Sequence, residues 1–122
     1  MGKVLVVDDE IHVLDSLKEF LAALGHEVYT AADGLEAVKK AKDERPDVVL
    51  LDIIMPGMGG IGVLEEIKKI EPSIVVVMLT ALTDEEIAKT AMNLGAFDYV
   101  TKPIDLHHLE EVVMVAMVEA AR

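Results

Sequence analysis

The chain of 122 residues contains no cysteine, no tryptophan, and only two tyrosines and two phenylalanines. Without cysteine it has neither a disulfide framework nor a thiolate metal site, a composition that agrees with a reducing compartment. Basic residues are also few, since 11 Lys and Arg stand against 23 Asp and Glu, giving a formal net charge of -12 at pH 7. Such a charge opposes contact with phosphate backbones and anionic lipids, so we expect no direct nucleic acid binding and no membrane partner.

Long apolar runs are missing as well. No stretch approaches the roughly 18 residues of a membrane span, and the start "MGKVLVV" lacks the basic region and cleavage signal of a secretory peptide. We therefore expect a cytoplasmic location. The composition, 52% hydrophobic and 28% charged, is typical of a globular protein and not of a disordered one. The length fits a single domain over residues 1–122.

Short apolar runs alternate along the chain with segments in which apolar residues recur at helical spacing. The pattern predicts strands at residues 3–7, 26–31, 47–52, 74–80 and 96–103, and helices at 13–24, 34–44, 61–70, 84–94 and 105–122. Five strands alternating with five helices predict an α/β fold, a parallel sheet with right-handed crossovers and helices on both faces. The second and fifth strands are the more polar ones and are expected at the edges.

Capping residues support these helix starts. Asp33 precedes one predicted helix and Asp105 is the first residue of another, so each can cap its helix, and Thr83 with Glu86 forms a capping box at a third. The segment "MPGMGG" (55–60) reads as a loop because of its glycines and proline.

Polar side chains follow the central strands at their carboxyl ends. Asp8 and Asp9 follow the first strand, Asp52 ends the third, Thr80 ends the fourth, and Lys102 ends the fifth. In an open parallel sheet these ends lie on one edge, which is where ligands bind. Carboxylates about 4 Å apart repel by roughly 4 kcal/mol at an effective dielectric near 20, so the cluster needs cations. Lys102 supplies one charge, and Mg²⁺, a hard ion that takes oxygen ligands, is the natural second source.

The same residues suit phosphoryl transfer, in which a carboxylate is the nucleophile and cations neutralise the phosphoryl oxygens. Asp52 stands alone at its strand end and is the better nucleophile, whereas Asp8 and Asp9 are better placed to hold the ion. Lys102 is followed by Pro103, and an X-Pro bond is the only kind with an appreciable cis population. We expect a constrained, cis-proline turn that directs the lysine inward.

Four segments, "VLVVDDE", "DVVLLDIIMPGMGG", "VVVMLTA" and "GAFDYVTKP", occur in an order and spacing that resembles the receiver domains of bacterial two-component response regulators. The resemblance covers residues 3 to about 118, and four matching segments make it specific. It implies a flavodoxin-like doubly wound sheet with strand order 2-1-3-4-5.

The resemblance also implies roles for individual residues. Asp52 would accept a phosphoryl group from a phosphohistidine on a sensor histidine kinase or histidine phosphotransfer protein. Asp9 would bind Mg²⁺ directly and Asp8 largely through water, and the Ile54 carbonyl would complete the protein ligands. Thr80 and Lys102 would contact the phosphoryl oxygens. Together these roles predict a signalling switch that catalyses its own modification and slow dephosphorylation, and not a turnover enzyme acting on external substrates.

In this family an aromatic ring on the fifth strand moves inward when the threonine at the end of the fourth strand moves. Tyr99 and Thr80 match these two residues and would form the switch. The surface of the fourth helix, fifth strand and fifth helix would then form a homodimer or hold an output partner or domain. The last helix carries a predicted sheet-facing stripe, and apolar residues beyond it predict an interface at Val112, Val115 and Val118. Extra aliphatic residues near a chain end are the alternative explanation.

Two departures from the family pattern have consequences. Gly59 stands where many members carry Asp, so the third helix loses a cap. The second departure is apolar side chains at two positions, Ile54, two residues after Asp52, and Leu82, two residues after Thr80. In the family these positions lie beside the route of a hydrolytic water. We therefore expect slow self-dephosphorylation. Whether the chain is a stand-alone receiver or the N-terminal part of a longer regulator stays open.

Two other classes also use a parallel sheet. Haloacid-dehalogenase-type enzymes have an aspartyl nucleophile and Mg²⁺, but their Asp-x-Asp pattern after the first strand is absent from "DDEIH". A flavodoxin-like redox carrier needs a hydroxyl-rich loop there, yet residues 8–14 contain no Ser or Thr. Both are weaker interpretations than the receiver domain.

Overall fold

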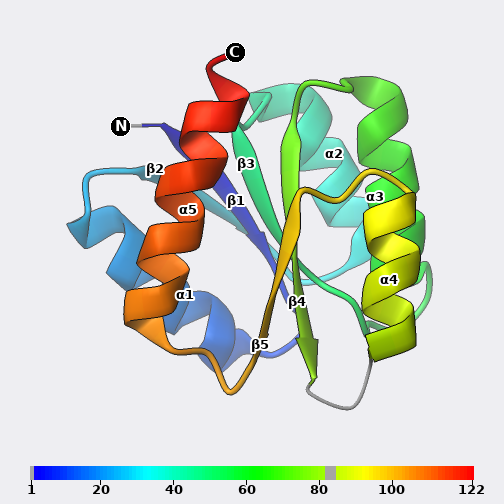
Figure 1. Ribbon diagram of the computed structural model, residues 1–122, viewed down its shortest axis with the longest axis horizontal. Coiled ribbons are helices and arrows are strands. Elements are labelled where there is room, and N and C mark those ends of the chain that lie inside the picture. The colour runs from blue at the N-terminus through cyan, green and yellow to red at the C-terminus, as the bar shows by residue number, and fades with distance from the viewer. Residues whose placement is uncertain (1, 82–84) are drawn as a thin grey trace.

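The computed structural model describes residues 2–81 and 85–122 (Figure 1). In these residues five parallel strands form one sheet in the order β2-β1-β3-β4-β5. The strands are β1 (Lys3–Val7), β2 (Glu27–Ala31), β3 (Val48–Asp52), β4 (Val75–Ala81) and β5 (Asp98–Lys102). The predicted strand order is confirmed, and the two more polar strands lie at the edges of the sheet.

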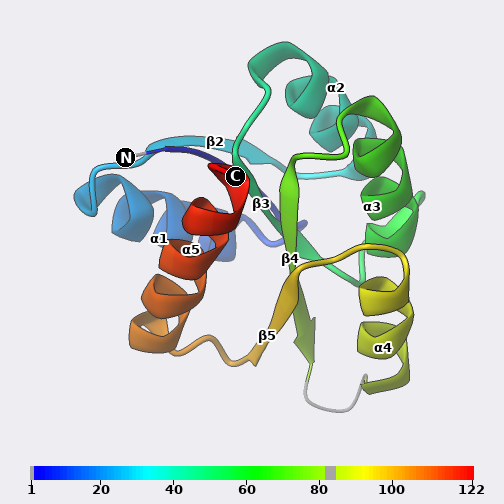
Figure 2. The same ribbon diagram turned by 45° about the horizontal axis from the view of Figure 1, so that its top comes forward.

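Helices cover both faces of this sheet. They are α1 (Ile11–Ala23), α2 (Gly34–Glu44), α3 (Gly59–Ile70), α4 (Glu85–Asn93) and α5 (Leu106–Ala120). Figures 1 and 2 show α1 and α5 on one face and α2, α3 and α4 on the other. In the part of the chain that the structure describes, no helix combines the length and apolar character needed to cross a bilayer.

The alternation of side chains along the central strands builds two core layers. Val49 and Leu51 of β3 pack under α2 and α3, whereas Val48 and Leu50 pack under α1 and α5. Because a large apolar side chain contributes about 1.5–3 kcal/mol when it is fully buried, the central strands require apolar residues on both faces. This requirement explains why they read as continuous aliphatic runs.

Local capping follows the sequence pattern at two helices. The Asp33 carboxylate accepts a hydrogen bond from the Glu36 N–H at 2.9 Å, and Asp105 accepts from the N–H groups of His107 and His108. The predicted capping box of Thr83 and Glu86 depends on a residue outside the described ones.

The third helix begins two residues earlier than its apolar period indicates, at Gly59 and not at residue 61. Met58 precedes it and makes no side-chain capping bond, which agrees with the predicted loss of a cap. Gly59 itself has a φ of 73°, a conformation that glycine adopts without steric cost.

One interface residue was predicted wrongly on α5. Val112 is only 7% exposed and belongs to the core beside Leu109, because a spacing of three residues places it on the sheet-facing side of the helix. Val115 and Val118, by contrast, are 56% and 60% exposed.

Candidate functional site

The carboxyl ends of the parallel strands lie at the lower edge of the sheet in Figure 1 and carry the predicted site residues. Asp8 directly follows β1, and its backbone N–H continues the sheet pairing by donating to the Ala31 carbonyl at 3.2 Å. Its carboxylate is fully buried and holds the start of α1, because Oδ1 accepts the Glu10 N–H at 2.9 Å. Asp8 is therefore a rigid, desolvated carboxylate. Asp9, next to it, is exposed.

Asp52 is the last residue of the central strand β3 and is 6% exposed. The Ile54 N–H approaches its Oδ1 at 3.3 Å, so the main chain of the following loop turns back over the carboxylate. Ile54 itself has an exposed side chain.

Lys102 links the two buried carboxylates. Its Nζ lies 2.9 Å from Oδ2 of Asp8 and 3.5 Å from Oδ1 of Asp52. Burial alone would lower the pKa of Lys102, but its contacts with Asp8 and Asp52 outweigh burial and raise that pKa above the ordinary value. The lysine is therefore held charged. Its peptide bond to Pro103 is cis, as predicted.

One lysine does not neutralise this group of carboxylates. Burial, followed by the negative charge of Asp8, raises the pKa of Asp52 from 3.8 to about 6, although Lys102 opposes the change. Asp8, Asp9 and Asp52 each offer a carboxylate oxygen, and these oxygens lie within 4.8 Å of one another. Three hard oxygen donors with an excess of negative charge fit a divalent cation such as Mg²⁺.

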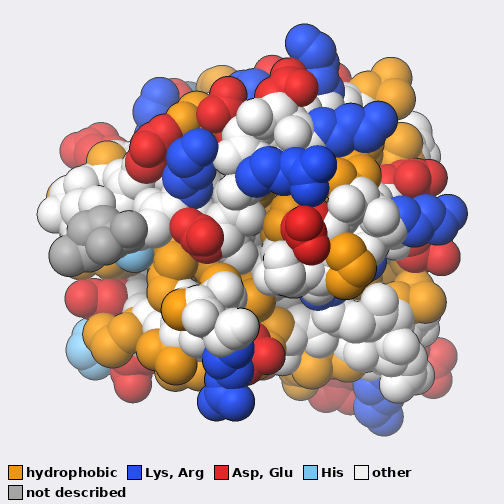
Figure 3. Space-filling view, turned by 90° about the horizontal axis from the view of Figure 1, so that it is seen from above, with side chains coloured by type: hydrophobic (Ala, Val, Ile, Leu, Met, Phe, Trp, Pro, Cys, Tyr) orange, Lys and Arg blue, Asp and Glu red, His pale blue; other side chains and the backbone are white. Residues whose placement is uncertain are grey.

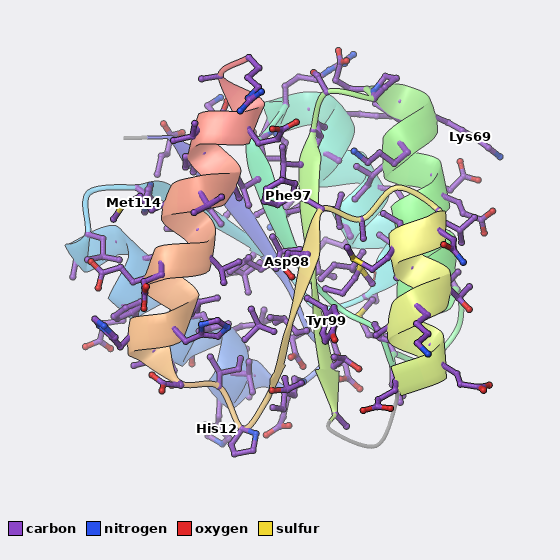
Figure 4. All side chains as sticks on the ribbon, viewed as in Figure 1. His12, Lys69, Phe97, Asp98, Tyr99 and Met114 are labelled. Carbon is purple, nitrogen blue, oxygen red and sulfur yellow. The ribbon has the colours of Figure 1, made fainter. Side chains whose placement is uncertain are left out.

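Thr80 and Tyr99 lie on β4 and β5 but do not join this cluster. Thr80 is buried, and its hydroxyl donates to the Ala81 carbonyl at 3.3 Å. Tyr99 is 42% exposed and lies on the face of the sheet that α4 covers, as Figure 4 shows. The structure thus brings together Asp8, Asp9, Asp52 and Lys102, with Thr80 next to them along the same strand ends.

Gly60 was missed by the sequence reasoning, which placed it in a loop. A Cβ atom at this position would lie 2.3 Å from the Asp52 carbonyl oxygen and 2.6 Å from the Ile53 Cα. The Gly60 N–H instead donates to the Ile53 carbonyl at 2.9 Å, so the start of α3 packs directly on the chain after Asp52. The pair of glycines in "MGG" was the available signal for this close approach.

The sequence model of the response regulator receiver domain matches residues 4–114. The chain belongs to this family. Among curated relatives, this receiver domain is 47% identical over 108 residues to the probable transcriptional regulator ycf27 of Cyanophora paradoxa, covering 88% of the chain and 45% of the relative. It is 44% identical over 102 residues to the alkaline phosphatase synthesis transcriptional regulatory protein PhoP of Bacillus subtilis, covering 83% and 42%. The chain thus spans less than half the length of these relatives.

Solved receiver domains have the same fold. The receiver domain of NtrX from Brucella abortus superposes with a TM-score of 0.89 at 37% identity, covering 93% of this chain and 97% of that one. A response regulator receiver domain protein from Clostridium thermocellum gives a TM-score of 0.92 at 37% identity, covering 96% and 94%. These matches confirm the fold and the family that the four sequence segments predicted.

Proposed function

We propose that the chain is a phosphorylation-driven signalling switch in which Asp52 accepts a phosphoryl group from a histidine kinase or histidine phosphotransfer protein. The observation that carries this proposal is a buried carboxylate at the end of β3, beside Asp8 and in contact with Lys102. Membership of the receiver family supports it.

The contacts around Asp52 support different roles for its two oxygens. The Ile54 N–H and the Lys102 ammonium both approach Oδ1, so Oδ2 is the better candidate for the nucleophile. Oδ2 would attack phosphorus, the bond between phosphorus and the imidazole nitrogen would break, and the imidazole would leave with the bonding electrons. Because the pKa of Asp52 is raised only to about 6, the carboxylate is still mostly ionised at pH 7.

The other site residues would position and neutralise the transferred group. Asp8, Asp9, Asp52 and the main chain at Ile54 would hold Mg²⁺, which when bound supplies positive charge to the phosphoryl oxygens. Lys102 would exchange its contact with Oδ1 of Asp52 for a phosphoryl oxygen.

The switch would begin at Thr80. Its hydroxyl would turn from the Ala81 carbonyl toward the phosphoryl group, and Tyr99, on the next strand, would follow. The surface of α4, β5 and α5 would then change its affinity for an output partner, an output domain or a second copy. Val115, an exposed apolar residue of α5, would belong to this surface.

Incubation with Mg²⁺ and a small phosphodonor tests the proposal. The parent chain should take up one phosphoryl group that hydroxylamine removes, as expected of an acyl phosphate, whereas Asp52→Asn should take up none. Asp98→Asn, at the amino end of β5, is the matched control and should label like the parent. Labelling of Asp52→Asn at the parent level would contradict the assignment, and rapid turnover of the donor would indicate a phosphatase.

A further inference from the structure

A groove of about 650 Å³ lies at the end of the molecule opposite the phosphoryl site. It runs between α5 and the connection from α1 to β2, and Gly2 and Asp47, just before β1 and β3, complete its lining. Met114, which contributes to its wall, points from α5 toward that connection in Figure 4. The proposed function uses none of the residues that line this groove.

The wall of the groove is apolar and adaptable. It is formed mainly by hydrophobic side chains from α5 and from the end of α1, namely Leu24, Met114, Met117, Val118, Ala120 and Ala121. Met114 and Val118 are each 60% exposed, so they form an apolar surface that no other part of the described chain covers. Figure 3 looks onto this end of the molecule and shows hydrophobic side chains gathered in its lower left quarter, on the side where α5 lies. Unbranched methionine side chains adjust to the shape of a partner and are common in grooves that bind helices.

The charge of the groove restricts its occupant. Asp47 and Glu110 line it, and the described lining residues include no Lys or Arg. His26 also lines it, but burial lowers the pKa of His26, and its Nδ1 accepts the Gly2 N–H at 3.4 Å, so it does not offset the carboxylates at pH 7. The surface is thus apolar in the middle and negative at its margins, within a chain of net charge -12. A second copy of the chain would bring the same carboxylates together, and an acidic or nucleic acid partner would be repelled.

We propose that this groove, defined by Leu24, Met114, Met117 and Val118, binds an amphipathic helix of a partner protein that carries Lys or Arg beside its apolar face. The groove runs beside α5, its methionines accommodate apolar anchors spaced one turn apart, and Glu110 and Asp47 pair with basic residues at the margin. Val118, which the sequence pattern assigned to the α4–β5–α5 interface, lines this groove, whereas no residue that the structure describes in α4 or β5 does.

The absence of tryptophan from the chain makes the test direct, because a single tryptophan in a peptide reports binding without background. The probe is a helix-forming peptide of about 18 residues, roughly five turns, with leucines on one face, lysines on the other and one tryptophan among the leucines. We expect saturable binding with a blue shift of the tryptophan emission. Met114→Glu should weaken binding by about tenfold or more, since it places a charge on the apolar wall.

Val115→Glu is the matched control, because Val115 is equally apolar and exposed on α5 but does not line the groove. It should change the affinity by less than about twofold. Glu110→Gln should weaken binding, whereas Glu111→Gln, one residue farther around the helix, should not. All four residues are at least partly exposed, and circular dichroism checks that the variants fold.

Three results would overturn the proposal. Equal weakening by Met114→Glu and Val115→Glu would mean that the peptide does not bind in the groove. Equal binding of a peptide with the same composition in shuffled order, and therefore no apolar face, would reduce the effect to net charge. Concentration-dependent self-association of the parent in sedimentation, abolished by Met114→Glu, would assign the groove to a second copy.

Discussion

Replacing Asp52 by Asn should stabilise the metal-free protein, because the structure places an ionised carboxylate where ionisation is unfavourable. Burial and the charge of Asp8 raise the pKa of Asp52 from 3.8 in the unfolded chain to about 6 in the folded one. A shift of about 2 pKa units corresponds to about 3 kcal/mol, and allowing for water at the open edge of the site reduces the expected gain to about 1–2 kcal/mol. Asn keeps an oxygen that can accept the Ile54 N–H and leaves Lys102 paired with Asp8.

The pH dependence of this gain follows from the direction of the shift. Because the folded state holds the Asp52 proton more tightly than the unfolded state, the carboxyl destabilises the fold progressively as the pH rises from about 4 to about 6. The penalty is complete above that window and absent below it. Asp52→Asn should therefore exceed the parent in stability at pH 7, and the difference should shrink toward zero as the pH falls to 4.

Urea denaturation in the presence of a chelator, at several pH values, measures this difference. At pH 7 the melting temperature should also rise by about 5 °C for a chain of this size. The control is Asp15→Asn, at an exposed position of α1, which should change the stability by less than about 0.5 kcal/mol. If Asp52→Asn is no more stable than the parent at pH 7, or if its gain is as large at pH 4, the electrostatic description of the site is wrong.

Three further predictions concern the same group of residues. Mg²⁺ at a hundredfold excess over its dissociation constant should stabilise the parent by about 2.7 kcal/mol, which is measured as a rise in melting temperature. Asp9→Asn should reduce this rise. A parent whose melting temperature does not change at saturating Mg²⁺ would argue against a metal site. Lys102→Ala should lower the free energy of unfolding in urea by about 2 kcal/mol, because it leaves the buried Asp8 carboxylate without its ion pair. The control Lys89→Ala, on the exposed side of α4, should leave that free energy nearly unchanged. Similar losses in the two variants would show that the pair contributes little. The phosphorylated form of Ile54→Asn should lose its phosphoryl group faster than the phosphorylated parent in a timed gel-shift assay. The reason is that the apolar side chain of Ile54, which is exposed close to Asp52, is removed and no longer keeps water away. Equal decay rates would rule out this shielding.

The layer structure of the fold was predictable because it depends on burial. Strands buried on both faces, such as Val48–Asp52, must be apolar at nearly every position, and the edge strands need not be. The parallel direction of the strands then brings residues 8, 52 and 102 to one edge whatever their separation in sequence. The composition of the site therefore followed from the parallel direction and the ends of the strands, whereas the strand order was implied only by the family resemblance.

The details that the sequence did not reveal depend on packing across elements. Nothing in the pattern shows that Lys102 lies closer to Asp8 than to Asp52, because this preference depends on how far each side chain reaches from its own strand. The role of Gly60 depends on the distance between α3 and the chain after β3, and periodicity carries no information about that distance. Val112 was misplaced because apolar residues surround most of α5, so the period alone did not define the edge of its buried face.

The central claim is that Asp52, and no other carboxylate of the cluster, becomes the acyl phosphate. Borohydride reduction tests it most directly, because an aspartyl phosphate is converted to homoserine and the altered residue is then located by peptide mass spectrometry. After treatment of the parent with phosphodonor and Mg²⁺, the account predicts homoserine at position 52 and unaltered aspartate at positions 8 and 9. Homoserine at position 8 or 9, or at none of the three in a chain that has taken up phosphate, would contradict it.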